Sequence, residues 1–169
     1  KDYYKDFFSV GVAVSPQALK GDESTLIKKE FNSMTAENVM KVGPIHPKQN
    51  EFNWGPADEI VAFAQANGMK MRGHTLCWHN QLPSWLFVNE KGDTVSKEIL
   101  LSRMKTHITE VVKRYKGKVY AWDVVNEVID NDGSYRPTTW VNAFGNGDTL
   151  VKYAFKFAAK YAPNTELYY

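Results

Sequence analysis

The chain has 169 residues, of which 43% are hydrophobic and 24% are charged, and its formal net charge is +2. This length suits one domain with a substantial core, and so small a charge without any lysine- or arginine-rich block argues against nucleic acid as a partner. No apolar run is long enough for a membrane span, and a single cysteine excludes an internal disulfide. We therefore expect a globular domain that binds neither nucleic acid nor a membrane.

Segments typical of strands and of helices alternate along the chain. The strands are predicted at residues 7–14, 31–38, 69–80 and 118–127, with a fifth at 166–169. The helices are predicted at 23–31, at 54–67, from a Ser96 cap to Tyr115, and from an Asp148 cap to Pro163. The long third helix would bury a stripe of six residues: Leu100, Met104, His107, Ile108, Val111 and Tyr115.

This alternation implies an α/β fold with a parallel sheet, either a doubly wound open sheet or part of a (β/α)8 TIM barrel. The stretch after Gly11 lacks the glycines of a dinucleotide fingerprint, and no phosphate loop is present. Both observations disfavour the doubly wound sheet. Polar or aromatic clusters end the second, third and fourth strands, as on the catalytic face of a barrel. Because a whole barrel takes about 250 residues, we predict only strands 1 to about 5, a partial domain over residues 1–169.

The fourth predicted strand ends in Asn126 and Glu127, an amide and a carboxylate side by side. A carboxylate at the end of an apolar strand can act as a general acid, although for Glu127 alone a solvated loop residue is the alternative. Strand alternation places Asp123 and Glu127 on one face and Asn126 on the other. Both members of the Asn-Glu pair therefore reach one ligand only if the strand twists or bulges at its end.

Asp123 would point into the barrel, where an unpaired carboxylate is costly, so we expect an orienting group paired with a histidine, most of all His79. His74 and His79 fall on opposite faces of their strand, and no further cysteine or acid completes a zinc set, so no metal site is predicted. His74 is expected to bind a sugar hydroxyl beside Trp78, an aromatic platform. His107, on the buried helix stripe, is expected to be a core histidine.

A third polar cluster follows the second strand in the stretch MTAENVMK. Its members Glu37, Asn38 and Lys41 offer donors and acceptors for neighbouring hydroxyl groups, with an ordinary polar loop as the alternative. Aromatic residues make up 14% of the chain, which suits a surface that stacks on sugar rings, although core packing accounts for part of this content.

Taken together, the stretches MTAENVMK, RGHTLCWHNQLPSW and WDVVNE resemble glycoside hydrolase family 10, the (β/α)8-barrel endo-β-1,4-xylanases, from the first strand to the last residue. The resemblance implies hydrolysis of internal β-1,4-xylosidic bonds in xylan with retention of configuration, without a cofactor, and with Glu127 as general acid/base. The substrate-binding residues that it implies are Glu37, Asn38 and Lys41 on the non-reducing side, His74, Trp78 and Gln81 near the cleavage point, and Asn126 beside the scissile bond. Cys77 stands where the family usually has a valine, a mild departure.

Retention requires a second carboxylate, the nucleophile, about 5–5.5 Å from the acid. In the family it belongs to a Thr-Glu-Leu-Asp-like motif on the seventh strand, which this sequence lacks. The stretch TELYY is a false match, because Glu166 precedes the apolar residues and so lies at the amino end of the fifth strand, opposite the site. We expect a complementing C-terminal barrel segment to supply the nucleophile, and this chain alone to be inactive.

Xylan and xylo-oligosaccharides are the expected ligands, and a secreted or exported protein is expected because the polymer stays outside the cell. Two other readings remain: a sugar-binding fragment without turnover, and a structural fragment that self-associates through its open sheet edges. A barrel glycosidase acting on cellulose or mannan is a further alternative, since an Asn-Glu pair at the fourth strand is widespread. The set of Glu37, Asn38 and Lys41 favours xylan.

Overall fold

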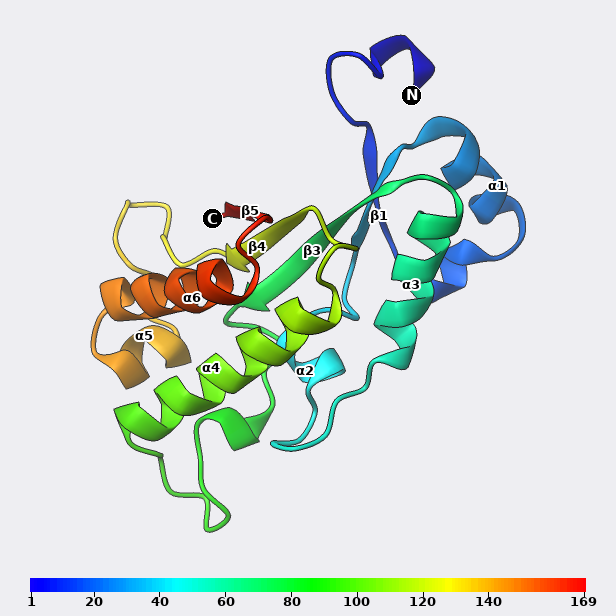
Figure 1. Ribbon diagram of the computed structural model, residues 1–169. Coiled ribbons are helices and arrows are strands. Elements are labelled where there is room, and N and C mark those ends of the chain that lie inside the picture. Colours follow the sequence, from blue (N-terminus) through cyan, green and yellow to red (C-terminus); the bar gives the residue numbers. More distant parts are fainter.

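The computed structural model describes residues 1–169 as five strands alternating with helices (Figure 1). The strands are β1 (Gly11–Val14), β2 (Ser33–Ala36), β3 (Lys70–Cys77), β4 (Ala121–Val125) and β5 (Glu166–Tyr168). The α-helices are α1 (Gly21–Glu30), α2 (Val42–Ile45), α3 (Gly55–Ala66), α4 (Lys97–Arg114), α5 (Thr139–Phe144) and α6 (Gly147–Tyr161). Three short 3₁₀ helices complete it: η1 (Asp2–Tyr4), η2 (Pro16–Leu19) and η3 (Ser84–Leu86). None of the helices is long and apolar enough to cross a membrane.

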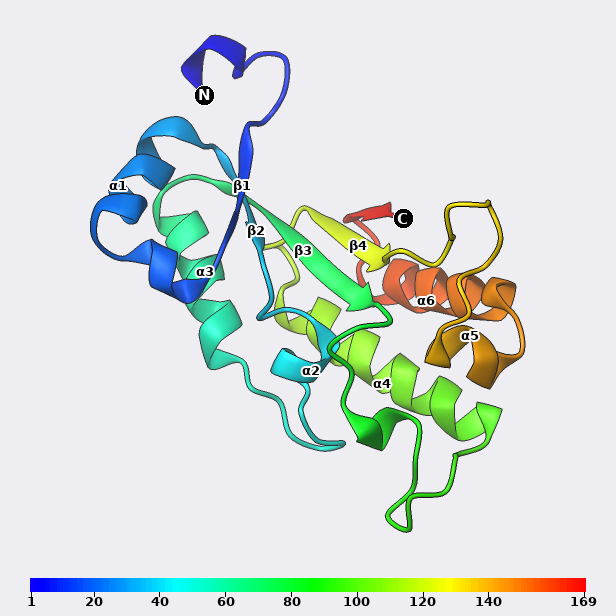
Figure 2. The ribbon, with the colours of Figure 1, turned by 180° about the vertical axis from the view of Figure 1, so that it is seen from behind.

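The five strands form one parallel sheet in the order β1-β2-β3-β4-β5. Spatial order equals sequence order, so the sheet has no point at which the order reverses, as a doubly wound sheet would have. The view from behind shows β2, β3 and β4 in front of α4 and α6, which cover the other side (Figure 2). This is the first part of a (β/α)8 barrel, as predicted, with β1 and β5 as its two edges.

The two faces of this sheet carry different residues because side chains alternate along each strand. Met34, Met71 and Trp122 point toward the helices and are at most 1% exposed. Gly73 is required beside them, since a Cβ at that position would overlap the ring of Trp122. On the opposite, concave face Arg72 pairs with Asp123 across β3 and β4.

Long segments follow the carboxyl ends of the strands, whereas short turns lead into their amino ends. Residues 37–54 follow β2 and precede α3, residues 78–96 follow β3, and residues 126–138 follow β4. Only residues 31–32 and 67–69 connect α1 to β2 and α3 to β3. The carboxyl ends of the strands therefore have the chain length needed to build a binding site.

The predicted elements are confirmed, but their ends differ. All five strands are shorter than predicted, because the outer residues of each segment lie in loops. Ser96 caps α4 by accepting a bond from the Ile99 amide at 3.4 Å, as expected, and all six residues of its predicted stripe are buried. The Asp148 cap is wrong: Asn146 caps α6 by accepting from the Thr149 amide at 2.8 Å, and Asp148 instead accepts a bond from the Tyr135 hydroxyl. Helices α2 and α5 were not predicted.

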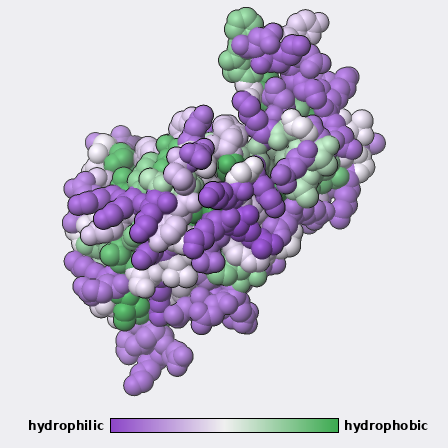
Figure 3. All heavy atoms as spheres, viewed as in Figure 1, coloured by the Kyte–Doolittle hydropathy of each residue, from purple (hydrophilic) through white to green (hydrophobic).

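The N-terminal segment before β1 projects from the body of the molecule (Figure 1). Its aromatic residues are largely exposed, with Phe7 at 82% and Phe8 at 58%. Apolar surface is visible on this projection in Figure 3. Exposed aromatic side chains beside the open β1 edge are suited to contact with another part of a barrel.

Candidate functional site

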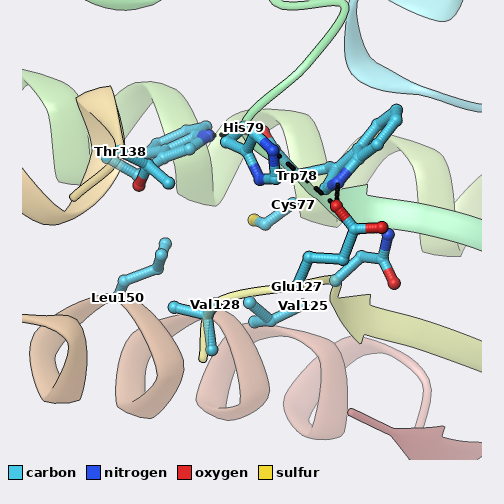
Figure 4. Close-up of a pocket in the computed structure, with 10 residues that line it drawn as sticks. Cys77, Trp78, His79, Val125, Glu127, Val128, Thr138 and Leu150 are labelled. Carbon is cyan, nitrogen blue, oxygen red and sulfur yellow. Dashed lines mark hydrogen bonds and ion pairs between the residues drawn. The ribbon is translucent and has the colours of Figure 1, made fainter. Parts of the chain in front are cut away.

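A small cavity lies where β3 and β4 end (Figure 4). Ten residues line it, and Glu127 is the only carboxylate among them: Cys77, Trp78, His79, Val125, Asn126, Glu127, Val128, Thr138, Trp140 and Leu150. Two predicted sets, the Asn-Glu pair and the His/Trp group, thus meet in one place.

Glu127 is held at this cavity by contacts to both its side chain and its backbone. Its Oε2 accepts a hydrogen bond from Trp78 Nε1 at 2.8 Å and lies 3.7 Å from His79 Nε2 (Figure 4). Its backbone carbonyl accepts from Arg136 Nε at 3.1 Å. The carboxylate side chain is 49% exposed, so it is fixed in position and still accessible to a ligand.

The backbone at the site is irregular at Gln81, at Glu127 and between His74 and Cys77. Only two residues other than glycine have a positive φ, Gln81 at 51° and Glu127 at 54°. Such a conformation is uncommon for a residue with a Cβ and concentrates at functional sites. The pairing of β3 with β4 also shifts by one residue between His74 and Cys77, and the His74–Thr75 peptide is cis. The prediction placed a twist or bulge at the end of the fourth strand, but the extra residue lies in β3; both Asn126 and Glu127 nevertheless line the cavity.

Trp78 links Glu127 to the third predicted set. The Lys41 ammonium lies 4.5 Å from the centre of the Trp78 ring. Lys41 Nζ donates to Asn38 Oδ1 at 2.8 Å, and Gln81 Nε2 donates to the same oxygen at 3.0 Å. The Asn38–Lys41–Gln81 group and Glu127 are therefore linked through contacts to a single indole ring, that of Trp78. Glu37 precedes this group at the end of β2 and is exposed.

The predicted pairing of Asp123 with His79 is wrong. Asp123 Oδ2 contacts His74 Nδ1 at 2.9 Å, and its Oδ1 accepts from Arg72 Nε at 2.9 Å. The reason is register: His74 and Asp123 are directly paired residues of β3 and β4, whereas His79 lies beyond the end of β3. Burial alone would raise the pKa of Asp123, but the bonds from His74 and Arg72 together lower it, so the carboxylate stays ionised.

Two buried histidines lie behind the site rather than in it. His107 is a core residue, as predicted, and its Nδ1 lies 3.2 Å from Nδ1 of His46. His46, which carried no sequence signal, is fully buried and stacks on Phe52 at 3.8 Å between ring centres. Burial lowers the pKa of His107 to about 3, which keeps this ring neutral.

The other reactive side chains are not arranged for metal binding or nucleophilic attack. No group of three or more His, Cys, Asp or Glu side chains is placed to hold a metal ion. Burial raises the pKa of the Cys77 thiol to about 12, so it remains protonated. Glu166 pairs with Ala121 at the start of β4, roughly 13 Å of strand before its end. Glu166 is therefore at the wrong end of the sheet to act with Glu127.

Sequence reasoning missed two residues that support the site. Arg72 completes the Asp123 pair, and its guanidinium lies 4.5 Å from the centre of the Tyr168 ring on β5. Trp140, from the unpredicted α5, donates its Nε1 hydrogen to the carbonyl of Trp78 at 2.9 Å. Thr138 caps α5 by accepting from the Val141 amide at 3.2 Å, and this threonine before an apolar stretch was the one available signal.

Comparison with known proteins agrees with this geometry. The family model described as glycosyl hydrolase family 10 matches residues 1–169. The chain belongs to this family. Family 10 relatives include the beta-1,4-xylanase of Dictyoglomus thermophilum, 48% identical over 171 residues, and endo-1,4-beta-xylanase B of Paenibacillus barcinonensis, 48% identical over 168 residues.

This family 10 chain spans half or less of the length of the curated relatives it matches. The match takes in 100% of the chain and 46% of the Dictyoglomus protein, and 98% of the chain and 50% of the Paenibacillus protein. The crystal structure of xylanase XynB from Paenibacillus barcinonensis, complexed with a conduramine derivative, superposes with a TM-score of 0.93 at 46% identity. That superposition covers 99% of this chain and 50% of XynB.

Proposed function

We propose that this chain supplies the general acid/base and the non-reducing-side sugar sites of a retaining endo-β-1,4-xylanase. The observation that carries the proposal is the placement of Glu127, whose accessible carboxylate is hydrogen-bonded to the same Trp78 ring that Lys41 of the Asn38–Lys41–Gln81 group contacts. Glu127 protonates the leaving glycosidic oxygen and later takes a proton from the water that releases the intermediate. Both relatives are named as xylanases, which supports xylan as the substrate.

The remaining predicted residues bind and orient the sugar chain. Asn38, Lys41 and Gln81 form one hydrogen-bonded group whose remaining donors contact sugar hydroxyls, with Glu37 beside them. Asn126 lines the cavity beside Glu127 and contacts the sugar next to the scissile bond. On the concave face, Asp123 holds His74 in one orientation toward that sugar. His79, 3.7 Å from Glu127, restricts the position of the acid.

The nucleophile comes from outside these five strands. We infer a second barrel half that joins the edges of β1 and β5 and covers the exposed aromatic residues of the N-terminal segment. The complete domain is this chain joined to such a half, for example the part of the Paenibacillus xylanase that the match leaves out. Because a polymeric substrate remains outside cells, the complete enzyme acts as a secreted or exported protein.

The test is Glu127→Gln in the complete domain. Loss of the proton donor should slow xylan hydrolysis by roughly 10²–10⁴-fold. An aryl xylobioside with a good leaving group should lose much less rate in the bond-breaking step, because its leaving group needs no proton. Glu37→Gln is the control: it should weaken binding of both substrates without separating their rates. Equal losses on xylan and on the aryl substrate in Glu127→Gln would contradict the acid/base role.

A further inference from the structure

A groove outside the cavity lies between the loop after β2 and the loop after β3. It consists of two adjoining hollows with volumes of about 510 Å³ and 90 Å³. Both hollows are lined by Gln49, Asn50 and Trp85. None of these three residues contributes to the cavity at Glu127, so the groove is a separate feature of the surface.

Trp85 forms a rigid wall of this groove. Its Nε1 donates to the His46 carbonyl at 3.0 Å, and its ring centre lies 4.5 Å from that of His46. Arg103, on α4, donates hydrogen bonds to the carbonyls of Trp85 and Val88 and so holds the turn of η3 against the helix. The only polar atom of the indole is thus satisfied inside the protein, and the ring surface that faces the groove is apolar.

The rest of the groove is polar but carries no net charge. The side chains of Asn50, Ser84, Ser102 and Thr106 line it and form no hydrogen bonds with other protein groups. Its ionised residues are two of each sign: Lys48, Glu51, Glu90 and Arg103. Lys48 and Glu51 pair with each other at 3.0 Å. A fixed aromatic surface with unpaired amide and hydroxyl groups, and without excess charge, matches a neutral sugar chain better than an anion or a peptide terminus.

We propose that this groove is a second binding site for xylan, outside the catalytic cleft. The choice of xylan as ligand rests on the proposed function. The same two loops carry Asn38 and Gln81 at the cleft, and the Gly43 amide joins them by donating to the Gln81 carbonyl at 2.8 Å. A polymer held in the groove is therefore kept next to the loops that bind the cleaved chain. Binding at two places raises the effective concentration of polymer at the cleft without affecting short substrates.

The experiment compares two variants of the complete domain. Asn50→Ala combined with Thr106→Ala removes one hydrogen-bonding group from the β2 loop and one from α4, and both residues are exposed. Gln65→Ala, an exposed polar residue on α3, is the matched control. The double variant should bind insoluble xylan about three- to tenfold more weakly with the cleft blocked by excess xylobiose. Its KM on soluble xylan should rise, while kcat/KM on an aryl xylobioside stays that of the control.

Unchanged affinity and KM in the double variant would overturn the proposal. A second measurement needs no groove variant: addition of xylohexaose to the Glu127→Gln domain should shift the indole N–H signal of Trp85 in a two-dimensional NMR spectrum. An unmoved Trp85 signal at saturation of the cleft would also overturn it. A third outcome separates the two proposals: the wild-type domain binds xylan but hydrolyses no β-1,4-glycan, and the double variant loses that binding. The proposed function would then fail, and the binding site in the groove would stand.

Discussion

The two faces of the sheet show how one set of strands serves two purposes. The helix-side face is apolar and closed, with Met34, Met71 and Trp122 at most 1% exposed. The concave face holds the ionised Arg72–Asp123 pair and His74, and leads to Glu127 at the end of β4. The interior of a TIM barrel is usually filled by branched apolar residues. Here, near the catalytic end, the concave face instead holds polar pairs. Their hydrogen bonds fix the orientation of each side chain, in addition to filling space.

The largest expected effect on stability comes from the helix-side face. Trp122→Ala should lower the free energy of unfolding by about 3–5 kcal/mol, because it leaves a cavity against Gly73 and Tyr115. Urea denaturation measures this change. Tyr120→Ala, a partly exposed aromatic just before β4 whose ring lies beside Lys70, is the control and should lose less stability. Similar losses in both variants would mean that the two positions do not differ in packing.

The buried histidine pair is an ionisable exception within the helix-side core. The pKa of His107 is lowered by burial to about 3, while an unfolded histidine titrates near its ordinary value of 6.5. Between these two values the unfolded chain binds a proton that the folded chain does not. Stability is therefore full above pH 6.5 and falls as the pH decreases toward 3, by at most about 1.4 kcal/mol per pH unit for this group.

His107→Gln tests that pH dependence, because glutamine does not titrate and keeps a donor for Nδ1 of His46. Urea denaturation between about pH 7 and about pH 4, which spans most of the interval between the two pKa values, should give a shallower decline in the variant than in the parent chain. Parallel declines would show that His107 does not set the acid sensitivity of the fold.

A smaller effect is expected from the concave face. Asp123→Asn keeps the shape of the side chain but removes its charge, and should cost about 1–3 kcal/mol at neutral pH through the weakened bonds to His74 and Arg72. Because these bonds lower the pKa of Asp123, its contribution is present above the ordinary carboxylate pKa and is lost as the pH falls through the lowered value. The difference between parent and variant should therefore shrink at acid pH, and a constant difference would contradict the assigned pairing.

Much of the fold could be read from local patterns. Alternation of apolar segments predicted every strand, and the spacing of Leu100, Met104 and Ile108 predicted the buried stripe of α4. Polar residues after three strands predicted that Glu127, Trp78 and Lys41 would meet, because parallel strands bring their carboxyl ends to one edge. The first and last residues of the strands were less predictable, because the hydrophobic segments continue into the loops.

Other features depended on contacts between distant segments. The partner of Asp123 was predicted wrongly because choosing between His74 and His79 requires the register of β3 against β4. His46 had no sequence signal, yet it is buried because the rings of Phe52, Trp85 and His107 surround it. Each of these contacts joins residues that no local pattern relates.

The sequence by itself determined the strand order, the amphipathic helices and the family, because these follow from the period of apolar residues and from motifs within short stretches. Only the tertiary structure decided which histidine orients Asp123, how Trp78 contacts both Glu127 and Lys41, and where the Trp85 groove lies. The physical reason is that hydrogen bonds and ring contacts act over a few ångströms, so they are set by the register and packing of segments far apart in the chain.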